Sequence, residues 1–175
     1  RKTGLALFAA ALSAVGYGAD FQTMKAEVAG VRPHDPGCYT QGLELWDGKF
    51  FESGGQYGKS NIRIVDAISG EVLRKVDFPS SFFAEGITSC PAGIWGLTWK
   101  EGSAMLFDSK TLSPVKTVNY KGQGWGLCYD GKRLIMSDGS AVLTMRHPET
   151  FDVQSTLTVT IGGTPQAQLN ELGYV

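Results

Sequence analysis

A repeated segment of about forty residues is the feature that most constrains how this chain of 175 residues can fold. Three segments align with one another, and each begins with a short motif in which a polar or aromatic residue precedes glycine. The aligned starts are Thr40-Gln41-Gly42-Leu43, Ala84-Glu85-Gly86-Ile87 and Gly124-Trp125-Gly126-Leu127. A fourth start, Leu169-Asn170-Glu171-Leu172, stands near the end of the sequence. An interval of about 40 to 45 residues is typical of the blades of a β-propeller.

Each repeat is built from short β-rich runs separated by turn signals, which indicates four strands per unit. The turn signals include Asp47-Gly48 and Ser69-Gly70 in the first repeat. His147 occupies the position of Asp66 and Asp108, so we interpret it as a polar turn residue and not as a metal ligand. The sequence therefore predicts an all-β propeller. A β-sandwich is the alternative, but it does not explain four matched starts at a near-constant interval.

The matched positions also predict where a functional site lies. In a propeller the innermost strand of each blade lines a central channel, and we expect the matched starts to form those strands. Four residues would then converge near one end of the channel: Gln41, Glu85, Trp125 and Asn170. A purely structural ring has no obvious need for a carboxylate beside an indole.

The N-terminal residues have the order of a secretory signal peptide. Arg1 and Lys2 are basic, Leu5 to Val15 form an apolar run, and small residues follow. We predict a signal peptide over residues 1–18, a propeller domain over 19–175, and a periplasmic or secreted protein. A buried N-terminal helix is the alternative. An exported protein can join two of its three cysteines, Cys38, Cys90 and Cys128, but buried free thiols fit the sequence equally well.

Charge and histidine content exclude several other classes of function. The formal net charge is −1 and no long run of like charges occurs, which disfavours partners such as nucleic acid or an anionic membrane. The chain has two histidines, His34 and His147, which are far apart in the sequence. We therefore expect no zinc or Cys-His site. There is also no glycine-rich phosphate loop and no nucleophile elbow.

Several motifs resemble the plant-type glutaminyl cyclotransferase family. They are Tyr39 to Leu43, Glu52-Ser53 with Gly55 to Ser60, Phe83 to Ile87, Leu97 to Lys100, Gly124 to Leu127 with Ser137 to Gly139, and Leu169 to Leu172. The similarity runs in order from Cys38 to Val175. The chain departs from the family pattern at three positions: Gly54 replaces a threonine, and Gln123 and Gly173 each replace an acidic residue.

This resemblance implies a five-bladed propeller that makes pyroglutamate from N-terminal glutamine, with loss of ammonia and without metal or another cofactor. By the length of its own repeat, the chain would hold about three and a half blades, with the final blades missing. We expect a strand over Lys25 to Val31, which in the family would complete the last blade. The implied partners are peptides or proteins with N-terminal glutamine, bound by a monomer that has no membrane attachment after removal of the signal.

The resemblance and the ring positions together assign roles to six residues. Glu85, the only carboxylate among the four ring residues, would carry the proton transfer. The expected substrate-binding residues are Gln41, Trp99, Trp125, Asp138 and Asn170. The indoles would pack on the glutamine methylenes, and the amides would hold the carboxamide or the oxyanion. Asp138 would bind the substrate ammonium or, equally, complete a turn. We assign Trp46 and Trp95 to the core.

Two other functions remain open at this point. One is a non-catalytic exported propeller that binds peptides or protein partners, which should tolerate glutamine in place of Glu85. The other is a propeller hydrolase of the lactonase kind, which usually needs a metal held by several channel side chains.

Overall fold

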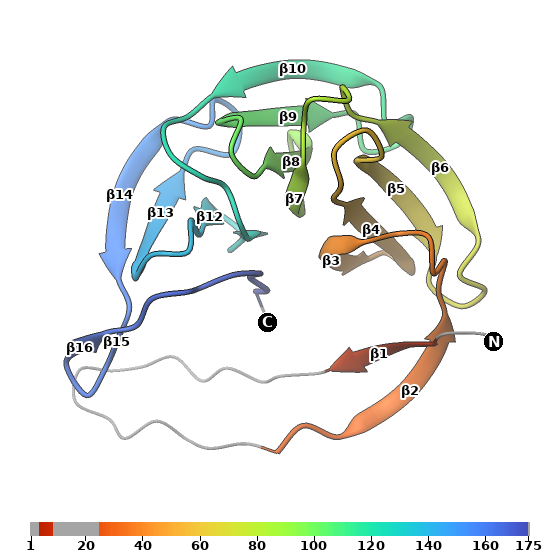
Figure 1. Ribbon diagram of the computed structural model, residues 1–175, viewed down its shortest axis with the longest axis horizontal. Coiled ribbons are helices and arrows are strands. Elements are labelled where there is room, and N and C mark those ends of the chain that lie inside the picture. Colours follow the sequence, from red (N-terminus) through yellow and green to blue (C-terminus); the bar gives the residue numbers. More distant parts are fainter. Residues whose placement is uncertain (1–3, 9–24, 175) are drawn as a thin grey trace.

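Four-stranded antiparallel sheets form most of the computed structural model, which describes residues 4–8 and 25–174. Three such sheets are arranged in an arc around a common centre, with their outermost strands along the rim (Figure 1). In each sheet the strands pair in sequence order, so that every sheet is a meander. This arrangement confirms the predicted all-β fold with four strands per repeat.

The strand bounds follow the three repeats. The first sheet contains β3 (Thr40–Trp46), β4 (Lys49–Gly54), β5 (Asn61–Asp66) and β6 (Val72–Asp77). The second contains β7 (Ala84–Cys90), β8 (Gly93–Thr98), β9 (Ser103–Phe107) and β10 (Pro114–Asn119). The third contains β11 (Leu127–Tyr129), β12 (Leu134–Met136), β13 (Val142–Arg146) and β14 (Val153–Thr158). The three matched starts therefore lie on or just before the innermost strands β3, β7 and β11, as predicted.

The turns of the meanders use the residues that the sequence offered. Asp47 and Gly48 connect β3 to β4 with φ angles of 48° and 70°. Two successive positive φ angles define the tight hairpin whose twist matches that of the flanking strands. At the turns after β5, β9 and β13 a side chain accepts backbone N–H groups two and three residues ahead. The acceptors are Asp66, Asp108 and His147. The prediction that His147 is a turn residue is confirmed.

The core lies between neighbouring sheets and not within any one of them. Strand β8 is buried along its whole length, and its successive side chains point to opposite faces. Ile94 packs into the cluster shared with the first sheet, which includes Ile62. Trp95 and Leu97 pack into the cluster shared with the third sheet, which includes Leu134. Each sheet therefore needs its neighbours to bury its faces.

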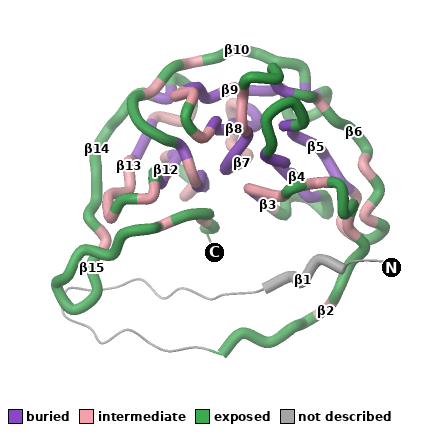
Figure 2. Tube along the Cα trace, viewed as in Figure 1, coloured by how far each residue is buried: buried purple, intermediate pink, exposed green. Residues whose placement is uncertain are grey.

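Burial is greatest in the middle strands and falls toward the rim. The outer strands β10 and β14 are mostly exposed, whereas the middle strands are buried (Figure 2). Trp95 is 0% exposed, which confirms its assignment to the core. The same assignment is wrong for Trp46, which is 61% exposed. Trp46 ends strand β3 at the Asp47-Gly48 turn, where its side chain lines an open groove together with Phe51 and Leu73.

Four short strands lie outside the three sheets. Strand β1 (Gly4–Phe8) pairs with β2 (Val28–Pro33), so the expected strand Lys25 to Val31 begins later than predicted and has β1 as its partner. Apart from β1, the predicted signal peptide 1–18 lies outside the described residues. Strands β15 (Thr160–Ile161) and β16 (Thr164–Pro165) form a small hairpin. Residues 169–172, expected to start a fourth innermost strand, belong to no strand.

The described part of the chain has no helix with the length and apolar character needed to cross a membrane. Its three cysteines are all free thiols, so the disulfide that the sequence allowed is not formed.

Candidate functional site

The ring residues are brought together by a glycine that follows each of the first three. A Cβ atom at any of these glycines would lie less than 3.0 Å from backbone atoms of the next repeat. The pairs are Gly42 with Ile87, Gly86 with Leu127, and Gly126 with Asn170. Only glycine allows this close approach, in which each innermost strand packs directly against the start of the next repeat.

Buried serine hydroxyl groups fix the same junctions through hydrogen bonds. Ser53 Oγ donates to the backbone oxygen of Glu85, and Ser137 Oγ donates to that of Asn170 at 2.7 Å. Both serines are 0% exposed. The backbone N–H of Gly86 also donates to the oxygen of Trp125 at 2.7 Å. The segment Leu169 to Leu172 is therefore docked beside β11, at the place expected of the next ring position.

Glu85 is the buried acid of this ring. The residue is 7% exposed, and within the described residues its carboxyl group makes no hydrogen bond. Burial raises the pKa of Glu85 to about 8, and the nearby charge of Glu101 adds to the increase. A carboxyl whose pKa lies near neutrality is suited to accept and return a proton.

Glu101 belongs to the second sheet's loop between β8 and β9. Its carboxylate accepts hydrogen bonds from the hydroxyl group of Tyr57 at 2.9 Å and from the backbone N–H of Phe83 at 3.3 Å. These contacts hold the Glu101 carboxylate near Glu85. Among the described residues, Glu101 forms no salt bridge with a cation. Sequence reasoning missed Glu101 because it lies in a loop and not at a matched position.

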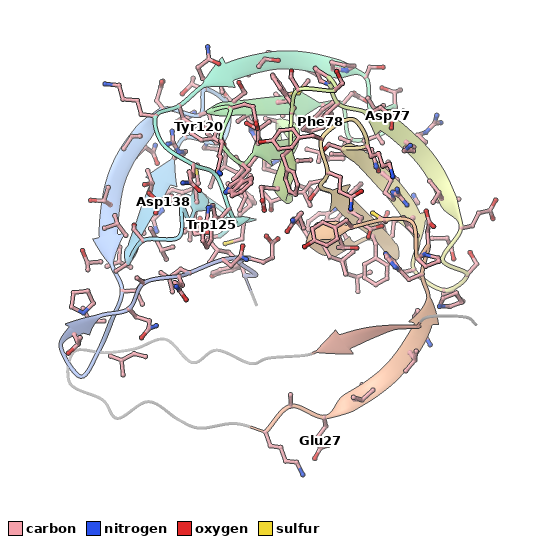
Figure 3. The ribbon with its side chains drawn as sticks, in the orientation of Figure 1. Glu27, Asp77, Phe78, Tyr120, Trp125 and Asp138 are labelled. Carbon is pink, nitrogen blue, oxygen red and sulfur yellow. The ribbon has the colours of Figure 1, made fainter. Side chains whose placement is uncertain are left out.

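Aromatic side chains surround the same end of the channel. Phe83 contacts Tyr57 and Trp99 edge to face, with ring centroids 5.4 and 5.6 Å apart. Trp99 and Trp125 meet at Gln123, whose side-chain oxygen accepts both indole N–H groups. All these residues come from loops between strands, and Figure 3 shows Trp125 near the inner side of the arc. They form an apolar wall with a hydrogen-bonded edge.

The remaining predicted residues lie close to this wall. The side chain of Gln41 is half-buried, and both its Cγ atom and the ring of Phe83 lie less than 3.0 Å from the position that a Cβ atom of Gly55 would take. Asn170 is exposed and docked through its backbone. Asp138 is exposed near Trp125 (Figure 3), and one of its carboxylate oxygens accepts the N–H of Ser140 at 2.9 Å. Asp138 therefore completes a turn, one of the two roles that the sequence allowed.

A second acid of the channel, Glu171, was also missed. Burial of its carboxyl group raises the pKa of Glu171 well above its ordinary value, and the negative charge of Glu85 raises this pKa further. The residue as a whole is nevertheless exposed to solvent, and water screens part of this interaction. Glu171 is the neighbour of Asn170 in the fourth start, so its position beside a ring residue was the available signal.

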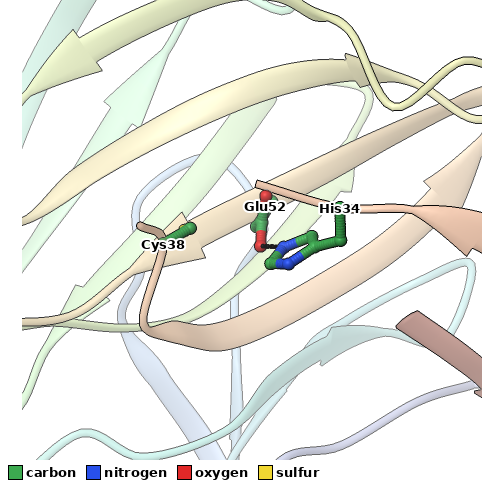
Figure 4. A group of neighbouring side chains, drawn as sticks. All are labelled: His34, Cys38 and Glu52. Atoms are coloured by element: carbon green, nitrogen blue, oxygen red, sulfur yellow. Dashed lines mark hydrogen bonds and ion pairs between the residues drawn. The ribbon is translucent and has the colours of Figure 1, made fainter. Parts of the chain in front are cut away.

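One group of described residues has the ligand types of a metal site. The side chains of His34, Cys38 and Glu52 approach one another at the end of β4 (Figure 4). The sequence predicts no zinc or Cys-His site because the two histidines are far apart, but it also places His34 close to Cys38 along the chain. His34 Nε2 and the hydroxyl of Thr40 lie 2.6 and 2.5 Å from Glu52 Oε1, and Arg63 lies 3.9 Å from Oε2. Because these donors already satisfy the buried carboxylate, we interpret the group as a hydrogen-bonded cluster.

Comparison with known proteins identifies relatives of this chain in sequence and in fold. A family model described as glutamine cyclotransferase matches residues 3–175. The chain is 39% identical over 154 residues to the glutaminyl-peptide cyclotransferase of Arabidopsis thaliana, covering 85% of this chain and 47% of that protein. The crystal structure of Myxococcus xanthus glutaminyl cyclase superposes with a TM-score of 0.73 at 33% identity, covering 80% of this chain and 59% of that one.

More distant similarity concerns the fold alone. The WD40 domain of Neurospora crassa Pan2 superposes with a TM-score of 0.56 at 13% identity, covering 66% of this chain and 35% of that one. Because WD40 repeats form propellers, this similarity agrees with the predicted architecture. The chain spans about half the length of the curated relative that it matches.

Proposed function

The chain belongs to the glutamine cyclotransferase family, and on this basis we propose that it converts the N-terminal glutamine of peptides to pyroglutamate and releases ammonia. The observation that carries the proposal is the state of Glu85. It is a buried carboxyl group with a pKa of about 8, and it is the one acid among ring residues that otherwise carry amide and aromatic side chains. Such a group can exchange a proton with a substrate at neutral pH.

The reaction needs one bond formed and one broken. The α-amine nitrogen attacks the carbon of the side-chain carboxamide, and the bond from that carbon to the amide nitrogen then breaks. The ionised form of Glu85 accepts the proton that the amine loses, and returns it to the leaving nitrogen, which departs as ammonia. The same carboxyl group thus acts first as base and then as acid.

The other residues hold the substrate in a folded shape that favours attack. We propose that Trp99 and Trp125 pack against the glutamine methylenes, and that the amide groups of Gln41 and Asn170 donate to the developing oxyanion. Asp138 keeps one carboxylate oxygen outside its turn hydrogen bond, and we assign that oxygen to the substrate ammonium. Because side chains supply every step, we propose that the reaction proceeds without a metal ion.

The experiment is ammonia release from a dipeptide that begins with glutamine, followed together with the mass of the peptide. We expect release well above the enzyme-free rate. A dipeptide with an acetylated N-terminus has no free amine and should release none, and an asparagine-initiated dipeptide lacks the methylene that closes the five-membered ring. Equal rates with and without the protein would contradict the proposal.

We also propose that the protein is exported and acts as a monomer on peptides or proteins. The basic start and the apolar run of Leu5 to Val15 support export. N-terminal sequencing of protein recovered from outside the cytoplasm should find a start near Tyr17 or Ala19. A secreted protein that still carries Gly4–Phe8 would contradict the signal peptide. Sedimentation of the purified protein tests the monomer.

A further inference from the structure

Gln123 joins the two indole rings of the aromatic wall through one atom. It lies in the loop between β10 and β11, and its Oε1 atom is 2.8 Å from Trp99 Nε1 and 3.0 Å from Trp125 Nε1. Trp99 follows β8 in the second sheet, whereas Trp125 precedes β11 in the third. A single acceptor therefore links the walls that two neighbouring blades contribute.

The chemistry of the indole group fixes how the amide is turned. An indole N–H can only donate a hydrogen bond, so the atom that faces both rings must be the carbonyl oxygen of Gln123. Its two lone pairs match the two donors. An apolar side chain at this position would leave both N–H groups without this partner.

Each ring is also held on another side. The ammonium group of Lys100 lies 3.7 Å above the centre of the Trp99 ring, and Phe83 meets that ring edge to face. The Trp125 ring packs directly on Gly139, where a Cβ atom would lie 2.6 Å from it. With one side covered and one edge bonded to Gln123, each indole has a defined orientation toward the channel.

We propose that Gln123 is a positioning residue that sets the orientation of Trp99 and Trp125 as one unit. It does not touch the reacting atoms. The effect of Gln123 on catalysis rests on the proposed function. Correctly oriented indoles would bind the substrate side chain equally well in the ground state and in the transition state. Losing that orientation should therefore raise KM and leave kcat nearly unchanged.

The first test reads the rings directly. In protein labelled with 15N-tryptophan, NMR measures the hydrogen exchange of each indole N–H. In Gln123→Met, which keeps the length but removes the acceptor, the Trp99 and Trp125 protons should exchange about fivefold faster or more. In Gln123→Glu, which keeps an acceptor oxygen in place, both should exchange as slowly as in the unaltered protein.

Two controls are built into this measurement. The indole N–H of Trp95 donates to the backbone oxygen of Pro148 at 2.8 Å and not to Gln123, so its exchange should not change. Gln154→Met places the same substitution on the exposed strand β14 and should leave all indoles unchanged. Unchanged exchange of Trp99 and Trp125 in Gln123→Met, or loss of protection in Gln123→Glu as well, would overturn the proposal.

The second test measures kinetics on a glutamine-initiated dipeptide. Gln123→Met should raise KM about tenfold with kcat within about twofold, and Gln123→Glu should restore KM. A matching loss of kcat would overturn the positioning role. The two tests also separate the claims. If the protein lacks cyclase activity but the indoles respond as expected, the proposed function fails and the positioning of the rings stands.

Discussion

At the scale of single residues, the site depends on how far its surroundings raise the pKa of Glu85. Burial is the larger cause of its raised pKa, and Glu101 is the second. The two causes can be separated, because Glu101 can be made neutral without changing the packing around Glu85. This gives the pH dependence of the reaction a specific origin in the structure.

We predict that Glu101→Gln moves the acid limb of kcat/KM to lower pH. Removing the negative charge makes ionisation of Glu85 easier, so the base form is reached at a lower pH. The amide can still accept from Phe83 N–H and donate to the Tyr57 hydroxyl, so the loop should keep its shape. The α-amine of the free substrate titrates in the same range but cannot respond to the mutation. An unmoved limb would show that Glu101 does not act on the base.

Stability should respond to Glu85 in the opposite direction from a salt-bridged carboxylate. Its pKa is about 8 in the folded protein and 4.5 as an ordinary value. Between these values the folded state keeps a proton that the unfolded state has lost, so stability falls as pH rises and the full penalty remains above pH 8. Glu85→Gln removes the penalty and should be the more stable protein by about 1–4 kcal/mol at pH 9.

Urea unfolding at pH 4 and pH 9 measures this difference. At pH 4 both states carry a protonated Glu85, so the variant and the unaltered protein should agree more closely. Glu71→Gln, in the exposed turn before β6, is the control and should show no such pH dependence. A variant that is less stable at pH 9 than at pH 4, relative to the unaltered protein, would contradict the burial of an ionisable Glu85.

Sequence reasoning located Glu85 because a repeat makes equivalent positions visible. It did not locate Glu101, Glu171 or the bridging role of Gln123, since these depend on how loops of different blades meet. Trp46 was placed in the core because indoles are usually buried, but it stands at the end of β3 in an open groove and is 61% exposed.

At the scale of elements, glycines at the blade junctions determine whether the ring can form. A Cβ atom at position 86 would lie 2.6 Å from the backbone of Leu127 and of Trp125, which cannot move aside as a side chain could. We predict that Gly86→Ala costs about 1–3 kcal/mol of stability and lowers activity. Gly173→Ala is the matched control, because nothing lies within 4 Å of that position. Equal midpoints in urea for both variants would rule out the close junction.

The turns at the ends of β5, β9 and β13 make the same hydrogen bonds to backbone N–H groups, with either an aspartate or a histidine as the acceptor. His147 Nδ1 accepts the backbone N–H groups of Glu149 and Thr150 at 3.2 and 3.3 Å. In their own turns, Asp66 and Asp108 accept the N–H groups at the equivalent positions. We predict that His147→Asp is tolerated, whereas His147→Ala costs about 1 kcal/mol through loss of the acceptor. Thermal unfolding compares the two; an alanine variant as stable as the aspartate variant would mean that the acceptor is not needed.

Strand order and turns were predictable at this scale because periodicity and turn residues are local signals. The partner of β2 was not, because pairing with Gly4–Phe8 joins residues that no local pattern connects. The fourth start was expected to be a strand. It docks through Ser137 and Gly126 without strand pairing among the described residues.

At the scale of the whole molecule, the blades are interdependent. The buried clusters lie between sheets, so each sheet is completed by its neighbours, and the ring exists only once successive innermost strands are docked. The repeat predicted this architecture, because a unit of about forty residues cannot bury both its faces alone. The channel, its acid and its aromatic wall are therefore products of assembly around the axis and not of any one blade.

The most direct test of the account is ammonia release from a glutamine-initiated dipeptide in EDTA, by the protein and by Glu85→Gln. The account predicts that the unaltered protein remains active in EDTA, that Glu85→Gln loses at least about 100-fold in kcat, and that Glu71→Gln does not change. Activity of Glu85→Gln at the unaltered rate, or no ammonia release by the unaltered protein, would contradict it.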